Sequence, residues 1–357
     1  MNARARHAWR TLARACSLAA CASLAGCAGV QSALDPAGPQ ANRIDKIWWL
    51  FLYVSVAVWV LVMIFLALSI YYGRGRRGKK GTDAPEVEER PDARPDPARE
   101  RRMTTMVVVA TVITTLTLIV LTVASFSIGR ALTSDMSNKD AVTIEVTGQQ
   151  WWWQVRYMDA DPSKIFYTAN ELHIPVGQPV TLKLKSPDVI HSFWVPNLVG
   201  KKDLVPGHDA TLWFQADKEG VYRGQCAEYC GLQHAHMAFW VIAEPLEKYQ
   251  AWLAGQRSPA HEPQTDSERR GQQVFLNAPC VMCHTIQGTP AGANIGPNLT
   301  HLASRAHIAA ATLPNTRGHL SGWVVDPQAI KPGNRMPPNL VKPDDLQALL
   351  DYLQSLK

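Results

Sequence analysis

Residues 226–237 read Cys226-Ala-Glu-Tyr-Cys230-Gly-Leu-Gln-His234-Ala-His-Met237, and this stretch decides how the 357-residue chain is interpreted. Two thiols, an imidazole and a thioether are spaced closely enough to converge on one metal locus. His191 is the natural second imidazole, arriving from another loop. Soft sulfur with imidazole suits copper, and a weak axial thioether is typical of electron-transfer copper. Zinc also accepts two cysteines and two histidines, but Met237 at this offset favours copper.

A second cysteine motif, Cys280-Val-Met-Cys283-His284, is the attachment sequence of a c-type haem. The thiols of Cys280 and Cys283 are expected to bond the haem vinyl groups, and His284 is expected to bind the iron. A chance match could instead be a zinc site or a redox dithiol. Two one-electron centres on one chain predict electron transfer, since neither motif suggests hydrolysis or group transfer.

The second axial ligand of the haem iron should be Met or His, and Met raises the potential. Met336 in Gly-Asn-Arg-Met-Pro-Pro, together with the stretch Gly296-Pro-Asn-Leu299, fits the pattern of class I cytochromes c. We therefore assign Met336. Met282 lies inside the attachment motif and cannot reach across the haem. The histidines that could compete with Met336 for the iron are His301, His307 and His319.

Two long apolar stretches predict transmembrane helices, over residues 47–72 and 103–129. The first holds an uncharged run of about 36 Å as a helix, enough to cross a hydrocarbon layer of about 30 Å. The second is rich in β-branched residues but far too long for a strand. The loop 73–102 contains ten Lys or Arg, so the positive-inside rule places it in the cytoplasm. The segment 27–46 and the chain after 129 then face the periplasm of a bacterial inner membrane.

The first 26 residues read as a secretory signal, with four arginines before an Ala-rich apolar stretch. The end of this stretch, Leu24-Ala-Gly-Cys27, resembles the cleavage box of bacterial lipoproteins. Cys27 would then become the lipidated first residue and add an anchor in the membrane lipid. The alternative is an ordinary signal peptide with an incidental cysteine.

Charge and cysteine usage exclude two other classes. The net charge of +6 comes mainly from residues near the membrane, while residues 131–257 carry a small negative excess. This distribution argues against a nucleic-acid partner. The seven cysteines fall into an N-terminal group and two close pairs beside His and Met, which favours metal and haem over disulfides.

Residues 130–257 alternate short apolar runs with turn residues, which predicts an antiparallel β-sandwich or barrel. The metal residues then fall on loops supported by a rigid sheet. A polar, Pro-containing linker follows at 258–266. Residues 267–357 form the haem domain, in which 267–276 and 343–356 are expected to be helical.

The stretches Gly148-Gln-Gln-Trp-Trp-Trp153, His191-Ser-Phe-Trp-Val-Pro196 and 226–237 resemble subunit II of haem–copper cytochrome c oxidases. The likeness covers nearly the whole chain after residue 40 and points to the caa3 type, which has a fused cytochrome c. It implies two transmembrane α-helices, a cupredoxin-like antiparallel β-sandwich with a dinuclear copper centre, CuA, and a small all-α class I cytochrome c domain.

Carried over by position, the resemblance makes Cys226 and Cys230 the bridging thiolates. His191 and His234 each bind one copper. Met237 and the backbone carbonyl of Glu228 are the weak ligands.

Further roles follow from the same resemblance. The Glu228 side chain would help to bind a magnesium ion shared with subunit I, as a carboxylate can. Trp151 matches the position at which electrons enter, although it could equally be an ordinary surface or core tryptophan. The usual Glu-x-x-Trp-Thr-x-x-Pro start of the second span is missing, so no proton-uptake role is assigned to Glu100.

The expected function is electron input to a terminal respiratory oxidase. A soluble or membrane-bound cytochrome c, or a cytochrome bc1 complex, would reduce haem c, and CuA would pass the electrons to subunit I. Subunit III is a further expected partner. The alternative is a membrane-anchored copper-delivery protein for oxidase assembly. A denitrification enzyme would need another catalytic copper domain, and a quinol oxidase subunit would have lost the copper ligands.

Overall fold

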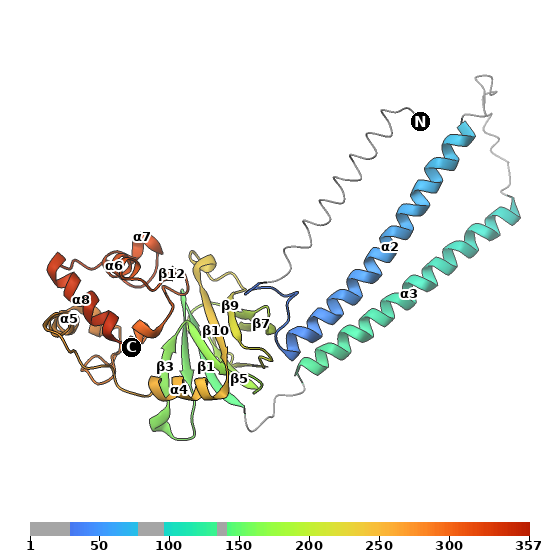
Figure 1. The fold of residues 1–357 in the computed structure, drawn as a ribbon. Helices are drawn as coiled ribbons and strands as arrows, with labels where there is room; N and C mark the ends of the chain where they lie inside the picture. The colour runs from blue at the N-terminus through green and yellow to red at the C-terminus, as the bar shows by residue number, and fades with distance from the viewer. Residues whose placement is uncertain (1–28, 78–95, 134–140) are drawn as a thin grey trace, which may run out of the picture. The chain divides into compact units, whose positions relative to one another are not determined.

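The computed structural model describes residues 29–77, 96–133 and 141–357. The expected signal peptide, Cys27 and most of the loop 73–102 therefore lie outside the described residues. Two long helices come first along the chain, α2 (Pro39–Arg77) and α3 (Pro97–Thr133) (Figure 1). Both are long and apolar enough to cross a membrane. Each expected span lies inside a longer helix, because hydropathy marks only the apolar part of a helix whose polar ends continue into water. Arg43 Nη1 donates to the Ala131 carbonyl at 2.6 Å, which joins the start of α2 to the end of α3.

The segment before α2 is fixed to the sandwich domain by main-chain hydrogen bonds. The Ala37 amide donates to the Asn197 carbonyl at 2.7 Å, and the Arg223 amide donates to the Val30 carbonyl at 2.7 Å. The Asn197 side chain donates to the carbonyls of Gly29 and Asp35 at 3.0 and 2.9 Å. The chain thus adheres to the sandwich immediately before its first candidate span.

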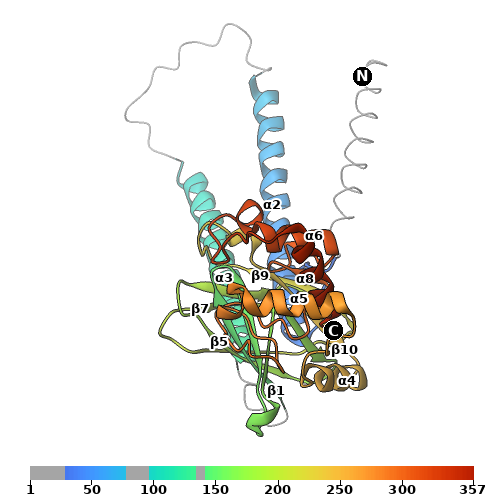
Figure 2. The same cartoon turned by 90° about the vertical axis from the view of Figure 1, so that its left-hand side faces the viewer.

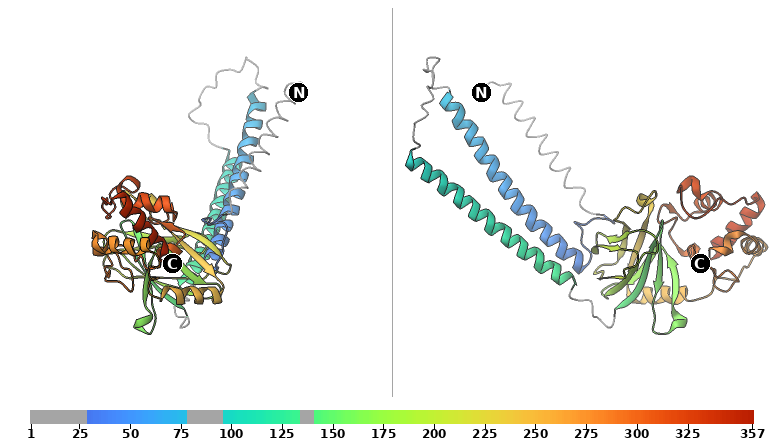
Figure 3. Two further views of the ribbon diagram at one scale, coloured as in Figure 1. Left: turned by 60° about the vertical axis from the view of Figure 1, so that its left-hand side comes forward. Right: turned by 180° about the vertical axis from the view of Figure 1, so that it is seen from behind.

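Residues 142–244 form a sandwich of two five-stranded sheets (Figure 1; Figure 3, right). The first sheet has the order β3-β2-β1-β5-β8, and the second has the order β4-β10-β9-β6-β7. In chain order the strands are β1 (Val142–Gln149), β2 (Trp152–Tyr157), β3 (Phe166–Ala169), β4 (Glu171–Pro175), β5 (Val180–Lys185), β6 (His191–Val195), β7 (Val199–Leu204), β8 (Ala210–Phe214), β9 (Gly220–Cys226) and β10 (Ala238–Glu244).

The sandwich itself is confirmed, but the strand pairing is mixed rather than wholly antiparallel. β1 pairs with β5 in parallel, and β4 pairs with β10 in parallel. The chain visits the other sheet between β1 and β5, and again between β4 and β10. These excursions supply the crossovers that parallel neighbours require. The expectation of antiparallel pairing came from short strand spacing, which carries no information about such crossovers.

The sandwich core is aromatic and lies directly beneath the candidate metal loops. Trp153, Phe193 and Phe239 are fully buried, and their ring centroids lie 4.6–6.0 Å apart. Strand β2 alternates half-buried and buried side chains, as a strand with one face on a core does. A well-packed, buried aromatic core therefore supports the loops at this end of the sheets.

A short helix, α4 (Leu246–Gln256), follows the sandwich, and irregular chain then leads to the helical domain. This domain contains α5 (Asp266–Asn277), α6 (Arg317–Val325), α7 (Pro327–Ile330) and α8 (Pro343–Ser355), with a small two-stranded sheet of β11 (His307–Ile308) and β12 (Leu313–Pro314). The helices expected at 267–276 and 343–356 are present with nearly those bounds.

Helices α5 and α8 form the centre of the helical domain (Figure 2). A capping box between Thr265 and Glu268 begins α5. At the crossing with α8, a Cβ on Gly271 would lie 2.0 Å from the Ala348 carbonyl oxygen, so only glycine permits this approach. Phe275 and Tyr352 bury their rings beside the crossing, with centroids 6.3 Å apart.

Candidate metal centre and haem site

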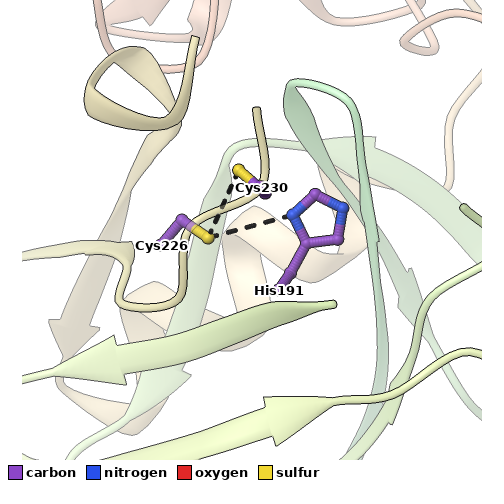
Figure 4. A group of neighbouring side chains, drawn as sticks. All are labelled: His191, Cys226 and Cys230. Atoms are coloured by element: carbon purple, nitrogen blue, oxygen red, sulfur yellow. Dashed lines mark hydrogen bonds between the residues drawn. The ribbon is translucent and has the colours of Figure 1, made fainter. Parts of the chain in front are cut away.

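Three donor side chains meet at one end of the sandwich (Figure 4). His191 begins β6, Cys226 ends β9, and Cys230 lies on the loop that follows β9. All three are buried, and their ligating atoms lie within 4.8 Å of one another. Cys226 Sγ is 3.8 Å from His191 Nδ1 and 3.7 Å from Cys230 Sγ. A disulfide has sulfurs about 2.05 Å apart, so these are two free thiols facing one point.

The same loop brings further donors to this point. Cys230 Sγ lies 3.6 Å from His234 Nδ1 and 3.9 Å from Met237 Sδ. The Glu228 carbonyl oxygen lies 3.2 Å from Cys226 Sγ. The structure therefore gathers all six donors named from the sequence. Two thiols, two imidazoles, a thioether and a carbonyl form a set whose softness fits copper.

Electrostatics favour thiolate at this site. The hydrogen bond between the two sulfurs, aided by His191, lowers the pKa of Cys226 well below its usual range against the opposing effect of desolvation. The same pairing and burial raise the pKa of Cys230. The pair thus keeps one proton in the metal-free protein, and that proton must leave when a cation binds both sulfurs.

Asp188 orients His191 and was missed in the sequence. The His191 Nε2–H donates to Asp188 Oδ1 at 2.9 Å, which leaves Nδ1 directed at the thiols. The Gln150 amide donates to Asp188 Oδ2 at 2.8 Å. Desolvation raises the pKa of Asp188, but the hydrogen bonds from its three partners outweigh this and hold the pKa at about 2. An acid three residues before a ligand histidine was the available signal.

Replacing Asp188 with asparagine is expected to weaken copper binding about tenfold, as loss of a histidine's outer partner does. It should also raise the potential of the copper centre, because a negative charge beside it disappears. Metal competition and potentiometric titration would measure both effects. In the metal-free protein, the folded pKa lies below the usual value, so the stabilisation is present above about pH 4 and lost as the pH falls towards 2. An unchanged acid-unfolding curve in the variant would contradict this assignment.

Trp151 lies at the metal loop but is not a surface residue. Only 9% of it is exposed, and its indole Nε1–H donates to the Cys230 carbonyl at 3.0 Å. The Gln150 side chain donates to the same carbonyl at 2.8 Å. Trp151 therefore contacts the thiol loop through one hydrogen bond, and its role in electron entry stays a prediction.

Glu228 presents its two polar groups to different surroundings. Its carbonyl faces Cys226, while its carboxylate is 42% exposed and lies 3.5 Å from the Lys201 ammonium. The carboxylate is therefore accessible to a hard cation shared with another subunit, with Lys201 as a competitor.

The haem motif occupies a 3-10 turn, Pro279–Met282, and the residues just after it. The His284 Nδ1–H donates to the Pro297 carbonyl at 2.8 Å, which fixes the tautomer and leaves Nε2 available for a metal. Burial lowers the pKa of His284, so the ring is held neutral, as a ligand must be. A Cβ at Gly296 would meet this ring at 2.7 Å, which explains the glycine there.

The loop carrying Met336 is held by side-chain amides. The Met336 amide donates to Asn334 Oδ1 at 2.8 Å, and Gln328 Nε2 donates to the carbonyls of Met336 and Asn334 at 2.7 and 2.8 Å. The competing His301 has its two ring nitrogens 2.8 and 3.1 Å from the carbonyls of Lys357 and Ser258, so neither is free.

The remaining competitors have other surroundings in the structure. The His307 ring lies against Trp240, with centroids 5.1 Å apart. His319 Nδ1 lies 3.0 Å from the Thr316 hydroxyl at the start of α6. Met282 is 68% exposed. The assignment of Met336 stays a prediction from the sequence.

Together these features define a protein with two candidate membrane spans, a sulfur-rich sandwich site and a helical domain that carries a haem-attachment motif. Residues 162–244 match the family model for the periplasmic domain of cytochrome c oxidase subunit II, and residues 268–357 match that for cytochrome c. Cytochrome c oxidase subunit 2 of Alkalihalophilus pseudofirmus is 36% identical over 345 residues, covering 94% of both chains. The chain therefore belongs to the cytochrome c oxidase subunit II family, whose members are parts of haem–copper terminal oxidases.

Other relatives cover less of the chain. Cytochrome c oxidase subunit 2 of Bacillus sp. PS3 is 30% identical over 67% of this chain and 68% of its own. Quinol oxidase subunit 2 of Bacillus cereus is 31% identical over 64% of this chain and 74% of its own. A solved periplasmic domain of subunit II from Bradyrhizobium japonicum is 29% identical and covers 34% of this chain and 96% of its own, with a TM-score of 0.31. The family expected from the sequence is confirmed, and its two domains imply CuA and haem.

Proposed function

We propose that this chain is the electron-input subunit of its oxidase. When bound, haem c would accept electrons from a periplasmic cytochrome donor and CuA would pass them to the haem of subunit I, where oxygen reduction drives proton pumping. The observation that carries the proposal is the contact between the loop bearing Met336 and the loop bearing the thiols. Gln233, next to His234, donates from Nε2 to the Pro332 carbonyl at 2.9 Å. Electrons would thus have a short route through packed protein.

The copper ligands are those that the resemblance implies, and the distances between their side chains support them. Cys226 and Cys230 would be the bridging thiolates, and their sulfurs lie centrally among the other donors. His191 and His234 would each bind one copper. Met237 and the Glu228 carbonyl would be the weak ligands.

The haem assignments rest on the sequence motifs. Cys280 and Cys283 would form the covalent links, and His284 would bind iron through Nε2. Met336 would be the second axial ligand, as its Met-Pro motif implies, and side-chain amides hold its loop in place.

The remaining proposals concern the surroundings of the two sites. Both soluble domains would lie on the periplasmic side of the bacterial inner membrane, which two spans with a basic loop between them support, and lipid on Cys27 would add an anchor. The Glu228 carboxylate would complete a magnesium site with subunit I. Trp151 would link the thiol loop to the incoming electron. Subunit III and a cytochrome c or bc1 donor complete the set of partners.

Rapid mixing of the oxidised complex with a reduced soluble cytochrome c tests this order. Haem c should be reduced first and the copper centre second, with a mixed-valence two-copper EPR signal and a low-spin haem in the oxidised state. Copper reduction that precedes haem reduction would reject the order. A single-copper signal would favour copper delivery instead.

His234 and His236 form a matched pair in one loop. His236 Nδ1 lies 2.8 Å from Gln233 Oε1, away from the thiols, whereas His234 Nδ1 faces Cys230. His234→Asn is expected to weaken copper retention at least about tenfold, whereas His236→Asn should retain copper, because only the first loses a ligand. Metal analysis after dialysis against a chelator measures this. Equal copper losses in both variants would mean that His234 supports only the conformation of the loop and is not a copper ligand.

A further inference from the structure

Lys331 belongs to the cytochrome domain but ends against the sandwich. It follows α7, and only 2% of the residue is exposed. Its Nζ donates to the carbonyls of Trp151 at 2.9 Å, His236 at 2.8 Å and Ala309 at 3.2 Å. An ammonium group has three donors and no acceptor, so these three carbonyls use its full capacity.

Two of these acceptors belong to the copper side of the molecule. Trp151 is bonded through its indole to the Cys230 carbonyl. His236 lies between His234 and Met237, two of the assigned ligands. Lys331 itself stands five residues before Met336, at the base of the loop that presents it. One side chain therefore joins the loops that carry the two metal sites.

The rest of this loop follows the same surface of the sandwich. Pro332 accepts its hydrogen bond from Gln233, which is 5% exposed. A Cβ on Gly333 would lie 3.7 Å from the Trp151 ring. Arg335 Nη2 lies 3.5 Å from Asp188 Oδ2, the carboxylate that orients His191. Residues 331–335 thus lie along the copper site with hydrogen-bond and ionic partners on it.

A strained segment marks the same interface. Ala309, Ala310 and Ala311 have φ of 55°, 59° and 58°, the left-handed region that alanine avoids. Lys331 bonds the Ala309 carbonyl, and the Ala238 amide of β10 donates to the Ala310 carbonyl at 3.2 Å. Such conformations persist where the surroundings over-determine them. The contacts between the two domains therefore favour one relative arrangement of these segments.

Burying the Lys331 ammonium costs free energy of desolvation, which its three hydrogen bonds must offset. Burial lowers the pKa of Lys331 to about 7, which reflects the penalty for desolvating the ammonium. An apolar side chain would avoid this penalty, but it would leave the three carbonyls without this donor, and that of Trp151 is buried. A buried polar group with a full set of partners can specify one arrangement over others.

We propose that Lys331 is a positioning residue that fixes the cytochrome domain on the copper-ligand loop, so that electrons cross through one standing contact. The electron-transfer half of this statement rests on the proposed function, whereas the domain contact does not. Without the lysine, the domain would remain tethered by the linker at 258–266 and would reach the copper face only part of the time.

Lys331→Met in the full-length subunit tests the contact. Methionine has similar length but no donor. The amides of Ala238 and Ala306 report docking directly, because they donate across the interface to the Ala310 carbonyl and to Glu171 Oε1. Their hydrogen exchange should accelerate about tenfold or more, as expected when the docked population falls. Lys342→Met, an exposed lysine of the same domain, should change neither amide.

The same pair of variants tests electron transfer. After rapid photoreduction of haem c, electron transfer to copper should slow about tenfold in Lys331→Met, while the optical spectra of both centres stay as in the parent protein. Unchanged exchange at Ala238 and Ala306 would overturn the proposal. Faster exchange with an unchanged transfer rate would overturn its electron-transfer half.

Two further measurements cover a Lys331→Met variant that does not fold and a parent protein without metal signals. If Lys331→Met does not fold, Lys331→Gln keeps an N–H donor of shorter reach and should show the same two changes at smaller size; no change there would overturn the proposal. Absence of copper or haem signals in the parent protein would reject the proposed function, while the exchange measurement would still decide the contact.

Discussion

The variant Cys226→Ser is expected to lose the copper centre and keep its haem. Cys226 Sγ lies between the Glu228 carbonyl, Cys230 Sγ and His191 Nδ1, at 3.2, 3.7 and 3.8 Å. A serine hydroxyl is a hard, protonated group and does not replace a bridging thiolate. Metal analysis should find fewer than one copper per iron, the copper EPR signal should vanish, and electron delivery to subunit I should stop.

The haem content of the same variant is its internal control. The two soluble domains have separate hydrophobic cores, one around Trp153 and Phe193 and the other around Phe275 and Tyr352. Loss of copper should therefore leave the haem spectrum intact. A variant that lost both centres would show that the domains fold as one unit, against our division of the chain.

The second large effect is expected from exchanging the axial sulfur at the haem. Met336→His should lower the haem potential on the order of 0.1 V or more, because a thioether favours the reduced iron. Each 59 mV is a factor of ten for one electron, so reduction by a soluble cytochrome should become more than about tenfold less favourable. Spectropotentiometry measures the first quantity and stopped-flow mixing the second.

Met282→His is the matched control for this exchange. Met282 lies between the two haem cysteines and is 68% exposed, so its replacement should leave the potential as it was. An equal shift of the haem potential in both variants, or no shift in Met336→His, would show that Met336 is not a ligand of the iron.

Local patterns predicted much of this molecule. The Cys226, Cys230 and His234 spacing is short, so a single loop between β9 and β10 delivers these side chains together whatever surrounds it. The helices expected at 267–276 and 343–356 are α5 and α8, with nearly those bounds. The ten strands of the sandwich all lie within the region 130–257, where short apolar runs predicted it. In each case the determining contacts lie within one turn, strand or loop.

Features that join distant parts of the chain were not predictable in this way. The parallel pairs of β1 with β5 and β4 with β10 depend on how the chain crosses between sheets. Lys331 reads as one more surface lysine, because its partners Trp151 and His236 are 180 and 95 residues away. The burial of Trp151 has the same cause, since a domain encoded far downstream covers it.

The close crossing at Gly271 also fixes when the haem domain can be completed. Its partner Ala348 lies in α8, so α5 cannot complete its packing until residues 343–355 have been synthesised. Until then the apolar face of α5 stays without the helix that buries it. We expect a chain that ends before residue 343 to be degraded by proteases rather than to fold.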